Sequence, residues 1–375
     1  MKKSQHVLIV GAGLGGLCLA QGLRKAGIRA TVFERDPAPN HRAQGHRVHL
    51  DDRGERALRA CLPDDLYRLH LATRGQPSER FMLISAKEER LREIPVPDLD
   101  DGSQMIRTGR GVSRQTLREI MLGGVDVHYD RHLTHYTEEA GGVTAHFANG
   151  ATATGDLLVG ADGIGSAVRH QKLPDARVLD TGVRWLGGKS PVTEEIRSSL
   201  PEGLETAFAA VTDMDPAMMV GYLLFDQSPA GLGLSEPGDY VMWAITVPKN
   251  RLPDPIPNLH KEAMALTATA HPTMRAIVTQ AWPDQCFHLS LGTAEPVAGW
   301  APTRVTLLGD AIHAMPPARA SGANTALEDA ATLTTNIQTE SPMAAYEADL
   351  RERGFAAVRA STAALEQVAK TIIQT

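Results

Sequence analysis

The sequence predicts an α/β protein built around a parallel β-sheet. Three stretches support this prediction, because each consists of an apolar strand, a turn that contains glycine, and a helical run: residues 6–26, 156–169 and 304–330. The apolar residues of these strands follow one another without alternation, as expected of parallel strands that are covered on both faces. Because the carboxyl ends of such strands line the ligand crevice of an open α/β sheet, we expect the three turns to meet there.

The first turn has the G-x-G-x-x-G spacing of a dinucleotide-binding motif. Gly11 permits the tight turn, and Gly13 lets backbone N–H groups approach a pyrophosphate. Gly16 lets the following helix pack closely on the strand, and the N-terminus of that helix directs a partial positive charge at the phosphates. A second strand, 30–33, ends in Glu34, where a carboxylate would accept hydrogen bonds from the adenosine ribose. This context predicts a dinucleotide site rather than a chance glycine turn.

The composition argues against several other classes of protein. The chain has 375 residues, of which 42% are hydrophobic and 22% charged, as in a soluble globular protein with room for two domains. A formal net charge of -6 and an aromatic content of 5% argue against a nucleic-acid surface. We expect no export and no membrane span, because no cleavage region and no sufficiently long apolar run are found. Three widely spaced cysteines without metal or redox spacing indicate a reducing cytoplasm and no disulfides.

The segment between the first two turns predicts a loop, helices and a β-meander. Within the loop of 36–49, His41, Arg42 and His46 are expected at the solvated surface. Arg47 lies in a short alternating strand, where a contact with the bound nucleotide and a surface charge are both open. Helical spacing covers 53–71, where Pro63 must break or start a helix, and a further helix is expected at 113–122 with Ser113 as N-cap. The strands expected here are 81–84, 90–94, 125–129, 133–138, 143–147 and 151–154.

The second and third turns each place an aspartate after a buried strand. Asp162-Gly163 would line the crevice, although an Asp-Gly turn with a helix N-cap also explains the local sequence. Asp310 follows the strand of 304–308 and lies close in sequence to a helix that opens at 322–330. That arrangement suits a polyol phosphate chain and a ring that carries negative charge. His313 is expected to pack or cap rather than to catalyse.

Residues 177–291 lack the α/β rhythm and predict a second domain whose sheet covers the crevice. Strands are expected at 182–186, 207–211, 218–225 and 240–247, helices at 194–200 and 259–270, and a proline-rich linker at 248–257. An apolar pocket and ordinary sheet core are both open for six large side chains: Trp185, Met214, Met218, Met219, Met242 and Trp243. The tail, 343–374, predicts an amphipathic helix packed on the first domain.

Taken together, the three turns and the helix that begins at Ser113-Arg114 resemble the single-component FAD-dependent aromatic monooxygenases. This is the para-hydroxybenzoate hydroxylase-like group, which includes tetracycline-inactivating and polyketide-tailoring hydroxylases, and the resemblance spans nearly the whole chain. It implies a Rossmann-like FAD-binding domain made of residues 1–175 and 296–375. It also implies an inserted β-sheet substrate domain, 176–295, to which the strands near 80–95 would add, and a C-terminal helix.

The resemblance also implies roles for individual residues. Glu34 would hold the adenosine ribose, Asp310 the ribityl chain, and the loop of 162–163 would serve both FAD and NAD(P)H. Other residues would meet the pyrophosphate, the flavin nucleotide and the isoalloxazine ring. No catalytic side chain and no metal ligand is singled out. The residues expected to bind the cofactor are Gly11, Gly13, Leu14, Gly15, Gly16, Glu34, Arg35, Arg47, Arg114, Asp162, Gly163, Asp310, Gly322, Ala323 and Asn324.

The activity that the resemblance implies is an FAD- and NAD(P)H-dependent monooxygenase. Molecular oxygen would react through a flavin hydroperoxide with an aromatic or polyketide-like small molecule, and the protein would be a monomer or weak homodimer. Beside the flavin the family usually has a glycine pair or Ala-Gly, whereas this chain has Arg319-Ala320. That departure motivates an alternative, a non-redox cyclase or isomerase on the same fold. A flavin-dependent halogenase, of which residues 243–248 carry a partial signature, and a non-catalytic FAD-binding protein are further alternatives.

Overall fold

A five-stranded parallel sheet forms the base of the molecule, as the sequence predicts. The protein is described by a computed structural model that covers residues 5–39, 41, 45–96 and 104–374. The sheet order is β18-β12-β1-β2-β8, and every neighbouring pair is parallel. The carboxyl ends of β1, β12 and β18, which carry the three turns, therefore lie side by side. The strands are β1 (His6–Val10), β2 (Arg29–Phe33), β8 (Val127–His128), β12 (Leu157–Gly160) and β18 (Val305–Leu307).

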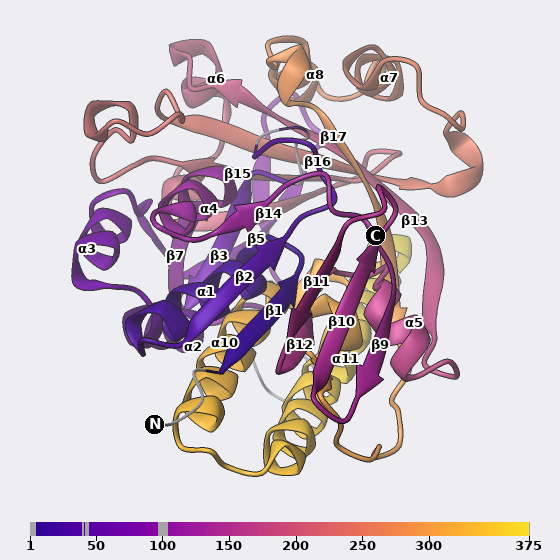
Figure 1. Cartoon of the computed structure of the whole chain (residues 1–375). Coiled ribbons are helices and arrows are strands. Elements are labelled where there is room, and N and C mark those ends of the chain that lie inside the picture. Colours follow the sequence, from indigo (N-terminus) through magenta and orange to yellow (C-terminus); the bar gives the residue numbers. More distant parts are fainter. Residues whose placement is uncertain (1–4, 40, 42–44, 97–103, 375) are drawn as a thin grey trace.

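Helices and a β-meander pack against this sheet (Figure 1). Helix α1 contacts β1 and β2 and is itself packed against α10, which also contacts α2 and α11. The meander, in the order β11-β10-β9, contacts β1 and β12 and is joined there by α5. These elements are α1 (Leu14–Lys25), α2 (Asp52–Cys61), α3 (Asp64–Ala72), α5 (Ala167–Lys172), α9 (Asp310–His313), α10 (Gly322–Gln338), α11 (Met343–Gln374), β9 (Leu133–Glu139), β10 (Gly142–Phe147) and β11 (Thr152–Gly155).

A seven-stranded sheet covers the parallel sheet from above in Figure 1. Its order is β17-β13-β16-β15-β14-β5-β6, and its pairs are antiparallel except for β5 with β14. The hairpin at 80–94 thus joins this sheet although it comes early in the chain. The strands are β5 (Arg80–Ser85), β6 (Arg92–Ile94), β13 (Val178–Pro191), β14 (Ala207–Thr212), β15 (Met218–Leu223), β16 (Tyr240–Pro248) and β17 (Phe287–Ala294).

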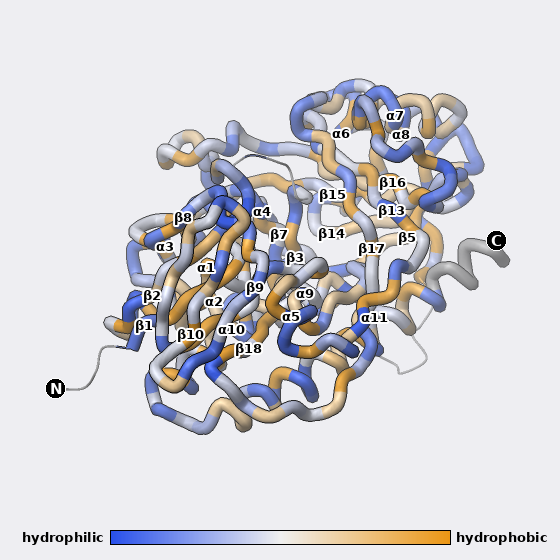
Figure 2. Tube along the Cα trace, turned by 45° about the vertical axis from the view of Figure 1, so that its right-hand side comes forward, coloured by the Kyte–Doolittle hydropathy of each residue, from blue (hydrophilic) through white to orange (hydrophobic). Residues whose placement is uncertain are grey.

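The two faces of the seven-stranded sheet bury different side chains. Along β16, Val241 and Trp243 pack under helices on the outer face, whereas Tyr240 and Met242 belong to a separate cluster on the inner face. This alternation follows from the two-residue period of a strand. Figure 2 shows the outer helices gathered over β13 and β16. They are α6 (Glu194–Ser199), α7 (Leu259–Leu266) and α8 (Pro272–Thr279).

A small antiparallel sheet connects the two large ones. Its order is β3-β7-β4, and the register places Arg47 on β3 opposite Ser113 on β7. Ser113 is the N-cap of the next helix, as predicted, and its hydroxyl accepts a hydrogen bond from the Thr116 N–H at 3.2 Å. These elements are β3 (Arg47–Asp51), β4 (Pro77–Ser78), β7 (Gly109–Ser113) and α4 (Arg114–Leu122).

Several sequence-based expectations are wrong in detail. Helix α8 and strand β17 were not expected, and β13 is longer than its predicted core. The helical stretch at 53–71 is two helices, α2 and α3, and the break between them at Pro63 is as predicted. His46 is buried rather than at the surface, while Arg42 lies outside the described residues. The three cysteines are free and buried. Among the described helices, none combines the length and the apolar character that a membrane span requires.

Candidate functional site

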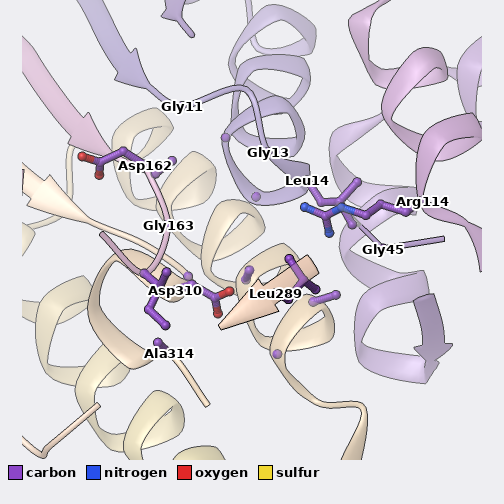
Figure 3. A pocket seen from close by; sticks show the side chains of 18 of the residues that line it. Gly11, Gly13, Leu14, Gly45, Arg114, Asp162, Gly163, Leu289, Asp310 and Ala314 are labelled. Carbon is purple, nitrogen blue, oxygen red and sulfur yellow. The ribbon is translucent and has the colours of Figure 1, made fainter. Parts of the chain in front are cut away.

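One cavity of about 510 Å³ lies between the carboxyl edge of the parallel sheet and the inner face of the seven-stranded sheet. The three predicted turns come together in its wall (Figure 3). Fourteen of the fifteen residues expected to bind a cofactor line it, and Asn324 does not. Those that line it are Gly11, Gly13, Leu14, Gly15, Gly16, Glu34, Arg35, Arg47, Arg114, Asp162, Gly163, Asp310, Gly322 and Ala323.

The glycines of the first turn are required for different reasons. Gly11 has φ +106°, and a Cβ there would lie 2.4 Å from the Ala161 carbonyl oxygen. A Cβ at Gly16 would lie 2.1 Å from the Gly11 carbonyl oxygen, so the helix could not approach its strand. A Cβ at Gly13 would meet no atom within 4 Å among the described residues. Gly13 therefore leaves open space in front of the N-terminus of α1, where an anionic group could approach the backbone.

Two charged side chains hold this turn in place. The Glu34 carboxylate accepts hydrogen bonds from the Ala12 N–H at 2.8 Å and the Asp36 N–H at 3.0 Å. The Arg118 Nε donates to the Ala12 carbonyl oxygen at 2.9 Å. The sequence-based list of site residues omits Arg118, although it is four residues after Arg114 and so shares a face of α4 with it. Arg131, which also lines the cavity, was missed because nothing in its local sequence distinguishes it.

Asp162 acts within the protein rather than towards the cavity centre. Its carboxylate accepts hydrogen bonds from the Ser166 hydroxyl at 2.5 Å and the Ala167 N–H at 2.8 Å, which caps the start of α5. Figure 3 shows this carboxylate turned away from Asp310 and Arg114. Burial raises the pKa of the Asp162 carboxyl, although these hydrogen bonds oppose the shift. Of the two interpretations that the sequence left open for Asp162, the local one, an Asp-Gly turn beside a helix N-cap, accounts for these hydrogen bonds.

Asp310, in contrast, points into the cavity (Figure 3). Its side chain is accessible through the cavity. Desolvation by the surrounding protein raises the pKa of the Asp310 carboxyl, and the charges of His313 and Arg114 partly offset this increase. Its Oδ1 lies 3.8 Å from the position that a Cβ would take at Gly322, so Asp310 reaches the first residue of α10. A carboxylate and a helix N-terminus therefore share this part of the wall.

A buried network fixes the turn that carries Asp310. The Asp329 carboxylate accepts a hydrogen bond from the Gly309 N–H at 2.9 Å, lies 2.6 Å from His313 Nε2, and pairs with Arg353 at 2.8 Å. Burial by itself would lower the pKa of His313, but the charge and hydrogen bond of Asp329 outweigh it and raise the pKa. His313 is fully buried and lies outside the cavity wall. The expectation that it packs rather than catalyses agrees with this position.

Arg169 and Asn324 also work behind the wall. Arg169 donates to the Ala311 and Ile164 carbonyl oxygens, each at 2.9 Å, and so joins the second turn to the third. The Asn324 amide accepts from the Asp51 N–H at 3.1 Å and donates to the His49 carbonyl oxygen at 2.8 Å. Its side chain thus connects α10 to β3.

The opposite end of the cavity is apolar and belongs to the seven-stranded sheet. Of the six side chains considered for a pocket, Trp185 and Met242 line the cavity, whereas Met214, Met218 and Trp243 pack on the outer face. Met219 packs against the inner-face cluster without lining the cavity. Part of this wall comes from β17, a strand that the sequence analysis does not predict within the second domain. The apolar residues at this end include Trp185, Phe208, Met242, Phe287 and Leu289.

His46 also faces this end of the cavity. Its Nε2 lies 2.5 Å from the Gln285 carbonyl oxygen, so Nε2 carries the hydrogen, and its ring packs edge-on against Phe287. Burial, helped by the charge of Lys189, lowers the pKa of His46 to about 4. The imidazole is therefore neutral near pH 7.

The comparison with known proteins identifies the family. A family model described as an FAD binding domain matches residues 4–341. The chain belongs to the FAD-binding monooxygenase family. It is 30% identical to the FAD-dependent monooxygenase dbaB of Emericella nidulans, over 88% of this chain and 86% of that protein. A crystal structure of a Photorhabdus luminescens protein assigned as an FAD containing monooxygenase has a TM-score of 0.76 at 27% identity, covering 97% of this chain and 99% of that one.

Other relatives in the family are longer proteins. The dual O-methyltransferase/FAD-dependent monooxygenase CTB3 of Cercospora beticola is 32% identical over 93% of this chain. This chain spans only 44% of that protein, and 39% to 41% of two similar dual enzymes. The match to the Photorhabdus luminescens structure confirms the fold expected from the sequence, and FAD is the cofactor that the family binds.

The cavity fits the cofactor of the family. The N-termini of α1 and α10 both face it, and among the described residues neither is capped by a side-chain hydrogen bond. Backbone N–H groups at both places are thus open to an acceptor. Gly13 leaves room for a phosphate, and the charged side chains of Glu34, Arg114 and Asp310 line the same cavity.

The departure from the family pattern lies in the loop before α10. Arg319 donates from Nη2 to the Gln104 carbonyl oxygen at 3.0 Å and does not line the cavity. Ala320 does line it, with φ +50°. A residue with a Cβ thus occupies a left-handed conformation in the loop where the sequence resemblance leads us to expect a glycine.

Proposed function

We propose that this chain is an FAD- and NAD(P)H-dependent monooxygenase that oxygenates an aromatic or polyketide-like small molecule. The observation that carries the proposal is the cavity between the two large sheets, because it joins a polar, glycine-lined crevice to an apolar chamber. A dinucleotide would occupy the first part and a flat apolar substrate the second. The family relationship and the name of the relative dbaB support the same assignment.

The residues of the three turns would hold FAD. Glu34 and Arg35 would lie at the adenosine end, and Leu14 and Gly15 with the N-terminus of α1 at the pyrophosphate. Arg114 would bind a phosphate and Asp310 the ribityl hydroxyls. The ring would lie beside Gly322 and Ala323, where the dipole of α10 stabilises negative charge.

The protein supplies the surroundings of the reaction, and bound FAD supplies hydride acceptance from NAD(P)H and the activation of oxygen. Trp185, Phe208 and Phe287 would exclude water and orient the substrate. The 162–163 turn would admit NAD(P)H. Because the cofactor carries the difficult chemistry, we propose no acid or base from the protein.

We also propose how the chain is divided into domains. Residues 1–175 and 296–375 would form the FAD-binding domain and 176–295 the substrate domain, to which β5 and β6 add their strands. The pairing of β5 with β14 supports the last point. A monomer or weak homodimer is proposed, since each chain has its own cavity.

The first test is the reductive half-reaction. The purified protein should be yellow, and NAD(P)H added without oxygen should bleach the flavin, faster when a substrate from a phenol and polyketide panel is present. With oxygen, the same substrates should stimulate NAD(P)H consumption and gain one oxygen atom. A flavin that stays oxidised with every substrate and both nicotinamides would contradict the proposal.

A substitution at Gly13 tests the FAD site separately. Gly13→Asp places a carboxylate in the open space before α1, where it would repel a pyrophosphate, while aspartate is itself a good N-cap residue. The variant should fold and purify colourless. Gly141→Asp is the matched control, because a Cβ at Gly141 also meets open space but lies in the β9–β10 turn. Equal flavin content in the two variants would argue against this site.

A second function, a non-redox cyclase or isomerase, is favoured by one observation. Ala320 places a Cβ where the family usually has glycine, and this methyl could hinder the ring movement that accompanies reduction. In that case substrate should turn over while the flavin stays oxidised and without consumption of NAD(P)H or oxygen. A strict requirement for both NAD(P)H and oxygen would exclude the non-redox function.

A further inference from the structure

Arg47 reaches from the small sheet to the inner face of the seven-stranded sheet. Its Nε donates to the Tyr222 carbonyl oxygen of β15 at 3.2 Å, and its Cζ lies 5.3 Å from the ring centroid of Phe208 on β14. Gly111 provides the space for this path, because a Cβ there would lie 2.8 Å from the Arg47 Nε. The guanidinium is therefore held at the apolar end of the cavity, whose wall it helps to form.

Within the described part of the chain, this guanidinium has no acidic partner. Arg110 on the neighbouring strand pairs with Asp226 at 2.9 Å and Arg53 with Asp51 at 2.6 Å, but no carboxylate forms an ion pair with Arg47. A guanidinium has five N–H donors, and only the one on Nε has an acceptor here. The four on Nη1 and Nη2 remain for a molecule in the cavity.

The groups around Arg47 offer no negative charge of their own. Burial, with a contribution from Arg47, lowers the pKa of His49 to about 4, and burial likewise keeps His46 neutral. Burial raises the pKa of the Tyr240 phenol well above its usual value. Burial also lowers the pKa of Arg47, to about 10, so the group is still charged at pH 7. An unpaired charge in such a place is costly unless an anion accompanies it.

We propose that Arg47 binds an anionic oxygen of the substrate, so that the enzyme selects aromatic molecules that carry a phenolate, enolate or carboxylate. The ring of such a molecule would lie among Phe208, Trp185 and Phe287, and its charged oxygen would accept from the Nη groups. This inference rests on the proposed function only in taking this end of the cavity as the substrate chamber.

The contacts favour the substrate over the cofactor as the partner of Arg47. The sequence resemblance implies a flavin contact for this residue, but its observed neighbours belong to β14 and β15 and not to the three nucleotide turns. Arg114, in contrast, lies close enough to Asp310 of the third turn to lower the pKa of that carboxyl. Arg114 can therefore serve the nucleotide, which leaves Arg47 for the chamber.

The test compares charged and neutral ligands on the oxidised holoprotein. The probes are 4-nitrophenolate against nitrobenzene and salicylate against salicylamide, titrated through the change in flavin absorbance. Arg47→Met should weaken binding of the two anions by about 10- to 100-fold, the range of a charge-assisted hydrogen bond, with little effect on the neutral probes. Arg47→Lys should keep most of the preference for anions.

Arg110→Met is the matched control, since Arg110 lies on β7 outside the cavity wall and should bind all four probes like the wild type. Three results would overturn the proposal: no preference for anions in the wild-type protein, an equal loss for charged and neutral probes in Arg47→Met, or a loss of FAD in that variant alone. Because no reduction or oxygen transfer is needed, the outcome is independent of whether the proposed reaction occurs.

Discussion

At the scale of single residues, Ala320 is a non-glycine residue in a left-handed conformation, with φ +50°. The left-handed conformation costs an L-residue roughly 1–2 kcal/mol, whereas glycine adopts it freely. The backbone of the loop before α10 is therefore held in place by its surroundings, including the hydrogen bond from Asn324 Nδ2 to the Ala320 carbonyl oxygen at 3.0 Å. The methyl group that results lies in the cavity wall.

Replacing this residue by glycine should stabilise the protein. We expect Ala320→Gly to raise the free energy of unfolding by about 0.5–1 kcal/mol, the relief of strain less the entropy that glycine loses on folding. Ala323→Gly, in the first turn of α10, should lower it by about 0.5–1 kcal/mol. Urea denaturation of the two variants measures both changes. Ala323→Gly is the control. If Ala320→Gly lowers the free energy of unfolding as this control does, the loop is not strained.

At the scale of the elements, α10 connects the parts that form the floor of the cavity. Asn324 near its start binds β3, and Asp329 one to two turns later binds the turn between β18 and α9 and pairs with Arg353 of α11. Both side chains are fully buried. The position of Asp310 in the cavity thus depends on a carboxylate that never touches it.

Removing the buried charge should be far more costly than removing an exposed one. Asp329→Asn leaves His313 and Arg353 without their shared anion, and we expect a loss of about 3–5 kcal/mol in the free energy of unfolding. Asp349→Asn removes another partner of the same Arg353, but this carboxylate is half exposed, and we expect a loss below about 1 kcal/mol. Urea denaturation of both variants decides the matter. Similar losses would mean that the Asp329 network carries little stability.

At the scale of the whole molecule, a buried ion pair of the seven-stranded sheet is tied to helix α4. Lys189 on β13 lies 2.7 Å from Glu236, and both side chains are buried. Glu236 also accepts a hydrogen bond from the Ser113 hydroxyl at 3.1 Å, the same hydroxyl that caps α4. The helix that carries Arg114 is therefore attached to the sheet that covers the cavity, and we expect the two sheets to unfold together.

Loss of FAD should therefore destabilise the whole molecule and not one sheet. A ligand present at 100 times its dissociation constant stabilises the folded state by about 2.7 kcal/mol. We expect the Tm of the apoprotein to rise with added FAD as one cooperative transition, and that of Gly13→Asp to stay unchanged. Two separate transitions, of which only one shifts with FAD, would contradict this coupling.

The sequence by itself determined the fold class and the positions that meet at the crevice. Short-range patterns are sufficient to predict the fold class and these positions. Local backbone geometry requires glycine at Gly11 and Gly16, and the repeated strand–turn–helix pattern brings the carboxyl ends of parallel strands to one edge of the sheet. The match to the FAD-binding monooxygenase family confirms the family that the three turns indicate.

Only the tertiary structure decided how the individual side chains are used. Asp162 and Asp310 follow equivalent strands, yet one caps a helix and the other faces the cavity. The sequence predicts a surface position for His46 and leaves a surface charge and a nucleotide contact open for Arg47, but residues of β14, β15 and β17 contact these side chains. The reason is that burial and pairing depend on contacts between segments more than 150 residues apart, such as Arg47 with Tyr222, which no local pattern encodes.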